Sequence, residues 1–508
     1  MKLFAIGDSI TQGFMSGAAA RTDLAYPTLI AKQMGLQDYQ YPKVWGAGGL
    51  PLNLEKVLRA LDKQFGSNIN GLDWVAALPL VNRLLDEVED YYEREDGQEN
   101  LPDPSGAVFY SNVAAQGFQV ADAWLMTPRL CQQEIRQSNA AGDNQDGLFA
   151  LPNAVFYRTA LKVLNPSLKP EYENYSQLEW LKYHAAQEGV ENVLVWLGAN
   201  NALGTVIGLT VNQTPNRGSL LDLHPEQRRR WNLWHPQDFA LEYRELLDRI
   251  DQILDNSQNP NCKVFVATVP LVTIAPIAKG VGPTTLMEVE PDFEIQSFEH
   301  QGKVAKGQSV YYKYYTYFFR DEEAILKRDT AYLTLADALH IDDCIRKYNR
   351  TIKALVTKKN QRFESDRYHV VDISKALQEI AYKRNAGQVQ YKFPEFFDFQ
   401  YPRVNTKYYH ADAQGRLRQG GIFGLDGIHP TAIGQGLIAY EFLKVMNQAG
   451  VVNADAIDLN WQEIFNSDSL YSKPIPIMQE LYENKQLAEF CLDVIMRRQT
   501  TREKQLRV

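Results

Sequence analysis

The stretch Leu3-Phe4-Ala5-Ile6-Gly7-Asp8-Ser9-Ile10-Thr11-Gln12-Gly13 decides the fold, because an apolar run there meets a Gly-Asp-Ser cluster and then a helical pattern. Four more apolar runs end in small or polar residues, at 107–110, 193–197, 264–269 and 368–372. Apolar strands with helix-length segments between them are typical of a parallel sheet covered on both faces. The sequence therefore predicts a doubly wound α/β fold with a five-stranded parallel sheet, whose ligand lies at the carboxyl ends of the strands.

The spacing between these strands is uneven. Long excursions occupy residues 41–106 and 275–335, and shorter ones occupy 131–185 and 205–235. Structureless loops of that length are uncommon in compact domains, so we expect partly helical insertions that cap the site. The charged stretch 451–508 has a broken apolar pattern, and we interpret it as a helical C-terminal extension of a main domain over 1–450.

Composition narrows the classes of function. The chain has 508 residues, a formal net charge of −9 and 45% hydrophobic residues, as in ordinary soluble globular proteins. The absence of a long basic run argues against nucleic acid or an anionic membrane surface as a partner. The apolar run 193–211 carries Asn200 and Asn201 at its centre, so we expect a strand and a loop there and no transmembrane segment.

The first residues and the cysteines bear on the compartment. The apolar run at 3–6 is too short for a signal peptide, so a cytoplasmic location is expected, although a trimmed export signal would leave the same sequence. The four cysteines are far apart and form no C-x-x-C pair. This spacing favours free thiols in a reducing compartment.

Ser9 is the first candidate for chemistry. A serine in a strand-to-helix turn presents its hydroxyl at the edge of the sheet, where the N–H groups of the helix favour developing negative charge. Serine is a weak nucleophile and needs a base. A helix N-cap is the alternative reading of an isolated Gly-Asp-Ser cluster.

The candidate base lies in Gly424-Leu425-Asp426-Gly427-Ile428-His429-Pro430. Histidine titrates near neutral pH, and a carboxylate three residues earlier can reach its Nδ1 and orient the ring. The alternative reading is a capping arrangement at the start of the next helix.

Two further strand ends offer hydrogen-bond donors. Gly117 follows the second predicted strand, where a glycine lets the backbone approach a ligand closely. Asn200 follows the third, where a side-chain amide can donate to an oxyanion. Singly, such residues indicate a turn or an Asx-turn. Together with the Ser9 N–H they predict an oxyanion hole.

The clusters Gly7-Asp8-Ser9, Gly117, Gly198-Ala199-Asn200 and Asp426-Gly427-Ile428-His429-Pro430 resemble the four blocks of the GDSL, or SGNH, hydrolases. The resemblance implies a flavodoxin-like three-layer α/β/α sandwich with large insertions. It implies Ser9 as nucleophile, His429 as general base and Asp426 as the third member of the triad. Ser9, Gly117 and Asn200 would form the oxyanion hole, and no metal or other cofactor is needed.

One block departs from the family pattern. The third block ends in Asn200-Asn201, where the family usually has Asn-Asp, so this loop lacks one carboxylate acceptor. The long separation of Gly117 from Ser9 is explained by the insertion at 41–106.

Three functions follow from this reading. The leading one is an esterase or lipase that cleaves a small-molecule, lipid or glycan ester through an acyl-enzyme on Ser9. The alternatives are a carbohydrate O-acetyl esterase of the same fold and a catalytically silent binding protein.

Two other clusters have alternative readings. The aromatic run from Tyr311 to Phe319 is predicted either to wall an acyl pocket or stack on a sugar ring, or to pack the core of the insertion. The run Arg228-Arg229-Arg230 is interpreted as a solvated helix face rather than as a site for an acidic head group.

Overall fold

The computed structural model describes residues 1–43, 49, 52–66, 71–93, 101–142, 152–218, 220–288, 297–299, 308–318, 320, 325, 327, 330–387, 389–400, 409–411 and 417–479. Its centre is a parallel sheet in the order β1-β2-β3-β8. In this sheet Ile6 lies opposite Val195, and Val195 lies opposite Val266. The strands are β1 (Phe4–Gly7), β2 (Asn192–Trp196), β3 (Lys263–Ala267) and β8 (Tyr368–Val371).

The expected fifth strand at 107–110 is corrected by the structure. Residues 111–115 run beside β1 instead, with one parallel bridge between Ala5 and Asn112. The N–H of Ala5 donates to Ser111 O, and the N–H of Val113 donates to Ala5 O. The N–H groups of Ser111 and Asn112 both donate to Gln40 O, so this segment divides its bonds between β1 and a loop. The fold is therefore α/β with a four-stranded parallel sheet and an irregular edge segment.

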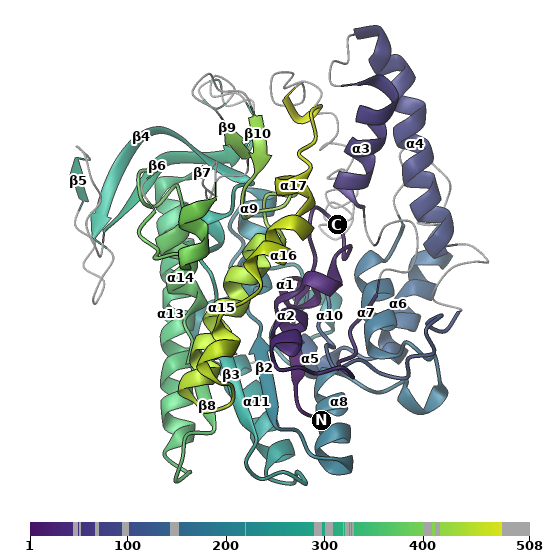
Figure 1. The fold of residues 1–508 in the computed structure, drawn as a ribbon, viewed down its shortest axis with the longest axis vertical. Coiled ribbons are helices and arrows are strands. Elements are labelled where there is room, and N and C mark those ends of the chain that lie inside the picture. The colour runs from purple at the N-terminus through teal and green to yellow at the C-terminus, as the bar shows by residue number, and fades with distance from the viewer. Residues whose placement is uncertain are drawn as a thin grey trace.

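Helices cover both faces of the sheet, because successive side chains on each strand point to opposite sides. Phe4 and Ile6 belong to one core, whereas Leu3 and Ala5 belong to the other. Figure 1 shows the resulting three layers. The first core is completed by α5 (Asp122–Leu125), α6 (Pro128–Ala140), α7 (Val155–Leu164), α8 (Gln177–Gln187), α11 (Pro236–Leu254) and α13 (Leu335–Asn360), and the second by α2 (Tyr26–Gln33), α14 (Ile373–Ile380), α15 (Ala432–Gln448) and α16 (Trp461–Ser467).

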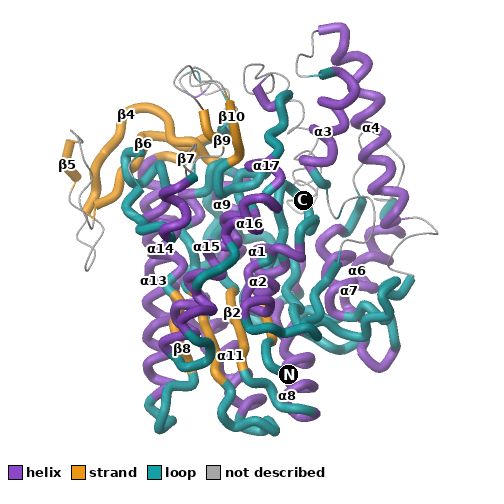
Figure 2. The backbone as a smooth tube through the Cα atoms, viewed as in Figure 1, coloured by secondary structure: helices purple, strands orange, loops and turns teal. Residues whose placement is uncertain are grey.

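The two long insertions differ from each other. The first contains α3 (Leu54–Phe65) and α4 (Gly71–Glu93), in agreement with the expected helical character. The second is an antiparallel sheet in the order β5-β4-β6-β7, which corrects the helical expectation for 275–335. Both lie toward the end of the molecule where the parallel strands finish (Figure 2). The strands are β4 (Ala278–Glu288), β5 (Ser297–Glu299), β6 (Gln308–Tyr317) and β7 (Leu333–Thr334).

The remaining described elements are short. Past α15, Trp461 and Ile464 of α16 pack into the same core as Leu437, so this part of the predicted extension is joined to the sheet layers. None of the described helices combines the length and the apolar character that crossing a membrane requires. The short elements are α1 (Ser9–Gln12), α9 (Gly204–Gly208), α10 (Pro225–Arg228), α17 (Ser469–Ser472), β9 (Tyr409–Ala411) and β10 (Leu417–Gly420).

Candidate active site

Ser9 is the first residue of α1, directly beyond the end of β1. Asp8, not Ser9, is the N-cap, because its Oδ1 accepts the N–H of Ile10 at 3.1 Å. This leaves the Ser9 hydroxyl available for another partner. As the first helical residue, Ser9 also has a backbone N–H with no acceptor inside the helix. The side chain is almost fully buried.

The loop before α15 brings a histidine to this hydroxyl. His429 Nε2 lies 2.8 Å from Ser9 Oγ, and His429 Nδ1 lies 2.8 Å from Asp426 Oδ2. The other oxygen of Asp426 accepts the N–H groups of Ile428 and His429, each at 2.9 Å. Three side chains from the two ends of the chain therefore form one continuous hydrogen-bonded line.

Backbone contacts hold the Asp426 loop in place. The N–H of Gly17 donates to Asp426 Oδ2 at 2.8 Å, so this carboxylate accepts four donors. Gly427 has a φ of +66°, and a Cβ there would lie 2.8 Å from the backbone nitrogen of Ile277. The sharp turn between Asp426 and His429 thus requires a glycine.

The pKa values of Asp426 and Asp8 are shifted in opposite directions. Burial opposes ionisation of Asp426, but His429 and the N–H donors outweigh it and hold the pKa of this carboxyl below its ordinary value. For Asp8, burial dominates and raises the pKa to about 7, against the lowering effects of the Ile10 N–H and of His429. The carboxylate that touches the histidine is therefore the one that stays ionised.

Among the described residues, the segment 116–120 presents one backbone N–H group without an acceptor. The N–H of Gln116 donates to Gln12 Oε1, that of Gln119 to Asp122 Oδ2 and that of Val120 to Asn201 Oδ1. The N–H of Phe118 donates to Ala115 O. Within the described ranges the Gly117 N–H has no partner, which leaves it available to a ligand.

Asn200 connects this segment to the strand end that carries Ser9. Its Nδ2 donates to Phe118 O at 3.0 Å and to Asp8 Oδ2 at 3.3 Å. These acceptors are the neighbours of Gly117 and of Ser9 in the sequence. The amide expected to donate to an oxyanion therefore already has acceptors at both of its hydrogens.

Asn201 stands where the family pattern has an aspartate. It is fully buried, and its Oδ1 accepts the N–H of Val120 at 3.2 Å. Its Nδ2 has no hydrogen-bond partner in the described part of the chain. The amide thus supplies the acceptor that the loop needs but adds a buried donor that an aspartate would not have.

A small cavity of about 60 Å³ lies against this line of side chains. Ser9, His429, Asn200 and Asp8 contribute to its wall, whereas Gly117 does not. The rest of the wall is apolar and comes from α1, from the segments after β2 and β3, from α14, and from α15 with the loop before it.

Sequence reasoning missed three residues that hold the site. Asp8 supplies the N-cap and an acceptor for Asn200, Gln12 holds the segment before Gly117, and the ring of Phe14 packs at 4.5 Å from that of His429. The position of Asp8 next to Ser9 was a local signal for the cap. No local signal points to the contacts of Gln12 and Phe14, because their partners lie far along the chain.

The two other clusters singled out in the sequence have structural partners. Tyr311 and Tyr315 are buried in the first core, as the core-packing alternative predicts, and Phe319 lies outside the described residues. Arg228 is buried and pairs with Glu242 at 2.8 Å. Arg229 lies over the ring of Phe156. The prediction of a solvated arginine face is therefore wrong for Arg228, because a buried carboxylate faces it.

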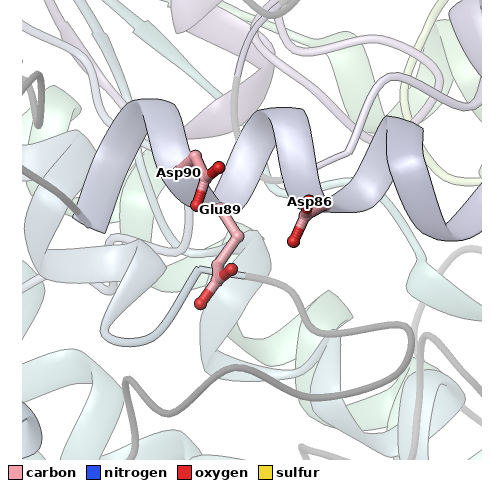
Figure 3. Close-up of side chains that lie close together, drawn as sticks. All are labelled: Asp86, Glu89 and Asp90. Carbon is pink, nitrogen blue, oxygen red and sulfur yellow. The ribbon is translucent and has the colours of Figure 1, made fainter.

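Three carboxylates on α4 form the one group in the described residues whose ligand atoms all lie within 4.8 Å of one another. They are Asp86, Glu89 and Asp90 (Figure 3). They belong to a separate helix and do not line the cavity beside Ser9. The line through Ser9 contains no such group.

Comparison with known proteins gives no family. The sequence matches no protein-family model and no curated protein. Among solved structures, the chain is similar to a family 3 carbohydrate esterase of Clostridium thermocellum, with a TM-score of 0.26 and 12% identity over 88% of this chain and 96% of that one. This likeness is too low to show a shared fold or chemistry.

Proposed function

We propose that the chain is a serine hydrolase of the SGNH type that cleaves carboxylic esters through an acyl-enzyme on Ser9. The observation that carries the proposal is the line from Ser9 Oγ to His429 Nε2 and from His429 Nδ1 to Asp426, with 2.8 Å at each step. A hydroxyl, an imidazole and an ionised carboxylate in this order are the parts that activate a serine.

The reaction begins with transfer of the Ser9 proton to His429 Nε2 as Oγ attacks the ester carbonyl carbon. The tetrahedral intermediate collapses when its C–O bond to the alcohol breaks and His429 protonates the leaving oxygen. Water then gives a proton to His429 and attacks the acyl carbon, and the proton returns to Ser9 Oγ as the acid leaves. Throughout, Asp426 stabilises the imidazolium and orients the ring.

The oxyanion is stabilised by N–H groups near Ser9. The Gly117 N–H has no acceptor within the described chain, and the Ser9 N–H lies at the start of α1. Asn200 is the third donor, and its amide exchanges the 3.3 Å contact with Asp8 for the oxyanion. Donors held ready for developing charge are a large source of catalysis.

The test is hydrolysis of p-nitrophenyl esters by the wild type, Ser9→Ala and Ser111→Ala. Ser111 is a buried serine outside the line of catalytic side chains, so it is the matched control. We expect Ser9→Ala to lower kcat by several orders of magnitude and Ser111→Ala to retain activity. A fluorophosphonate probe should attach to Ser9 in the wild type. If the wild type shows no turnover of any ester and no labelling of Ser9, a catalytically silent binding protein is the remaining interpretation.

A further inference from the structure

The cavity beside Ser9 is small, partly open and largely apolar. Its walls include Leu271, Val272, Leu377, Ile380, Leu437 and Ile438, which come from the segment after β3, from α14 and from α15. Among its lining residues the one carboxylate is Asp8. A site of this composition excludes charged and strongly hydrated groups, because burying them without partners is unfavourable.

We propose, on the basis of the esterase function above, that this cavity is the acyl pocket and that it restricts the enzyme to short acyl groups. Ser9 lies in its wall, so an acyl group bonded to Oγ enters the cavity directly. The alcohol, which must leave before water attacks, then lies on the open side of the site.

The size of the cavity sets the length of the acyl group. An apolar cavity of roughly 150 Å³ can hold a benzene molecule of six carbons. By the same measure, the volume of about 60 Å³ beside Ser9 holds about two to three carbons beyond the carbonyl carbon, which stays beside the oxyanion donors. The preferred substrates are therefore acetyl to butyryl esters.

One wall of the cavity, the segment after β3, is held by buried polar contacts, so it does not move easily. Lys383 Nζ donates to Thr273 O at 2.8 Å and to Ala275 O at 2.7 Å. Asn349 accepts the N–H of Val269 at 2.7 Å and donates to its carbonyl at 2.8 Å. These bonds hold both ends of the segment after β3, so this wall resists the displacement that a longer acyl group would require.

The chain offers a matched pair of variants on one helix. Leu437 and Leu443 are both buried leucines of α15, but Leu437 lines the cavity and Leu443 does not. Leu437→Ala should enlarge the pocket, whereas Leu443→Ala removes the same atoms elsewhere in the core.

The experiment measures kcat/KM for p-nitrophenyl acetate, butyrate, hexanoate and octanoate. For the wild type and for Leu443→Ala, kcat/KM should be about tenfold or more lower for hexanoate and octanoate than for butyrate. The reason is that one methylene in a hydrophobic pocket changes kcat/KM by about 10–200-fold. Leu437→Ala should shift the preference toward hexanoate and octanoate. Ser9-dependent turnover that is equal for all lengths, or highest for octanoate in the wild type, would overturn the acyl pocket and leave the proposed function intact.

A second series varies the alcohol while the acyl group stays acetate. Ethyl, benzyl and naphthyl acetates should show no change of preference in Leu437→Ala. If discrimination follows the alcohol and Leu437→Ala relieves it, the cavity holds the alcohol and the proposal is wrong. Absence of both turnover and Ser9 labelling would overturn the proposed function and the pocket assignment together.

Discussion

The amide of Asn200 is hydrogen-bonded to the carboxyl of Asp8, at 3.3 Å between Nδ2 and Oδ2. The other Asp8 oxygen accepts the N–H of Ile10, so one buried carboxyl holds both the helix that carries Ser9 and a donor of the proposed oxyanion hole. This makes Asp8 a positioning residue, because it acts on the reaction through Asn200 and α1. A protonated carboxyl loses one of its acceptor sites, so the arrangement depends on pH.

The pH profile of Asp8→Asn tests this role. Burial raises the pKa of Asp8 to about 7, so the carboxyl becomes neutral as the pH falls through that value. We expect kcat/KM to fall with decreasing pH more steeply in the wild type than in Asp8→Asn, with a limiting slope against pH that is greater by about one. The same slope in Asp8→Asn and in the wild type would show that protonation of Asp8 does not affect the reaction.

Protonation of Asp8 should have opposite effects on activity and on stability: as the pH falls, kcat/KM decreases but the free energy of unfolding increases. The folded pKa of Asp8 is about 7 and its ordinary value is 3.8, so the folded state holds the proton more tightly. The free energy of unfolding contributed by this group therefore falls as the pH rises between those values and is constant above them. Between pH 5 and 8, wild type should lose on the order of 3 kcal/mol relative to Asp8→Asn in urea unfolding. A constant difference between the two proteins would show that Asp8 has an ordinary pKa.

Gly117 is tested by comparison with a second glycine of similar backbone conformation. Gly117 has a φ of +75° and Gly35 has a φ of +69°, but only at Gly117 would a Cβ meet another side chain, Phe156, at 3.0 Å. Each change to alanine should destabilise the fold by about 1–2 kcal/mol through the left-handed backbone. Only Gly117→Ala should also lower kcat, by displacing its N–H. Equal activity of both variants would exclude Gly117 as an oxyanion donor.

The strand ends that form the site could be predicted, because short stretches of the sequence are enough to identify them. Apolar runs that end in Gly7-Asp8-Ser9 or Gly198-Ala199-Asn200 mark strand ends, and the carboxyl ends of parallel strands must lie at one edge of the sheet. Reasoning of this kind placed Ser9 and Asn200 near each other. The contact between Asp8 and Asn200 joins residues 192 positions apart, and no local pattern encodes it.

The errors in the predicted fold have physical causes. The run 107–110 is apolar enough for a strand, but the partner of Ala5 is Asn112, whose polar side chain breaks the pattern. The described part of the insertion at 275–335 forms strands in which Tyr311 and Tyr315 are buried and pack on Arg384. Aromatic residues favour strands, so this pattern was readable from the sequence and was outweighed by the length of the excursion.

Arg384 should be a large source of stability for the antiparallel sheet. It is fully buried and donates to Asp342 Oδ2 at 3.0 Å and to Tyr315 Oη at 3.0 Å. Arg384→Met leaves the Asp342 carboxylate buried without its cation, which should lower the free energy of unfolding by about 3–5 kcal/mol. The exposed pair of Arg217 and Asp222 provides the control, since Arg217→Met should change it by less than about 0.5 kcal/mol. Similar urea midpoints for the two variants would refute the structural role of Arg384.

Asp426 has the most specific geometry in the site, because one carboxylate accepts four donors, including His429 Nδ1 at 2.8 Å. Asp426→Asn places an amide N–H among these donors, so the imidazole loses its orientation and its counter-charge. We expect kcat to fall by about 10⁴ with a smaller change in KM. Asp468→Asn alters another buried carboxylate, which accepts the N–H of Ile433, and should leave kcat unchanged.

The pH dependence of stability separates this effect on chemistry from an effect on folding. The folded pKa of Asp426 lies below its ordinary value of 3.8, so its contribution to the free energy of unfolding is full above that value. It is lost as the pH falls through the lowered value. Asp426→Asn should therefore be less stable than wild type at pH 7, and the difference should shrink in strong acid. In conditions that restore the stability of Asp426→Asn to that of the wild type, kcat should stay low. If kcat recovers there as well, Asp426 acts through the fold alone and the proposed triad is wrong.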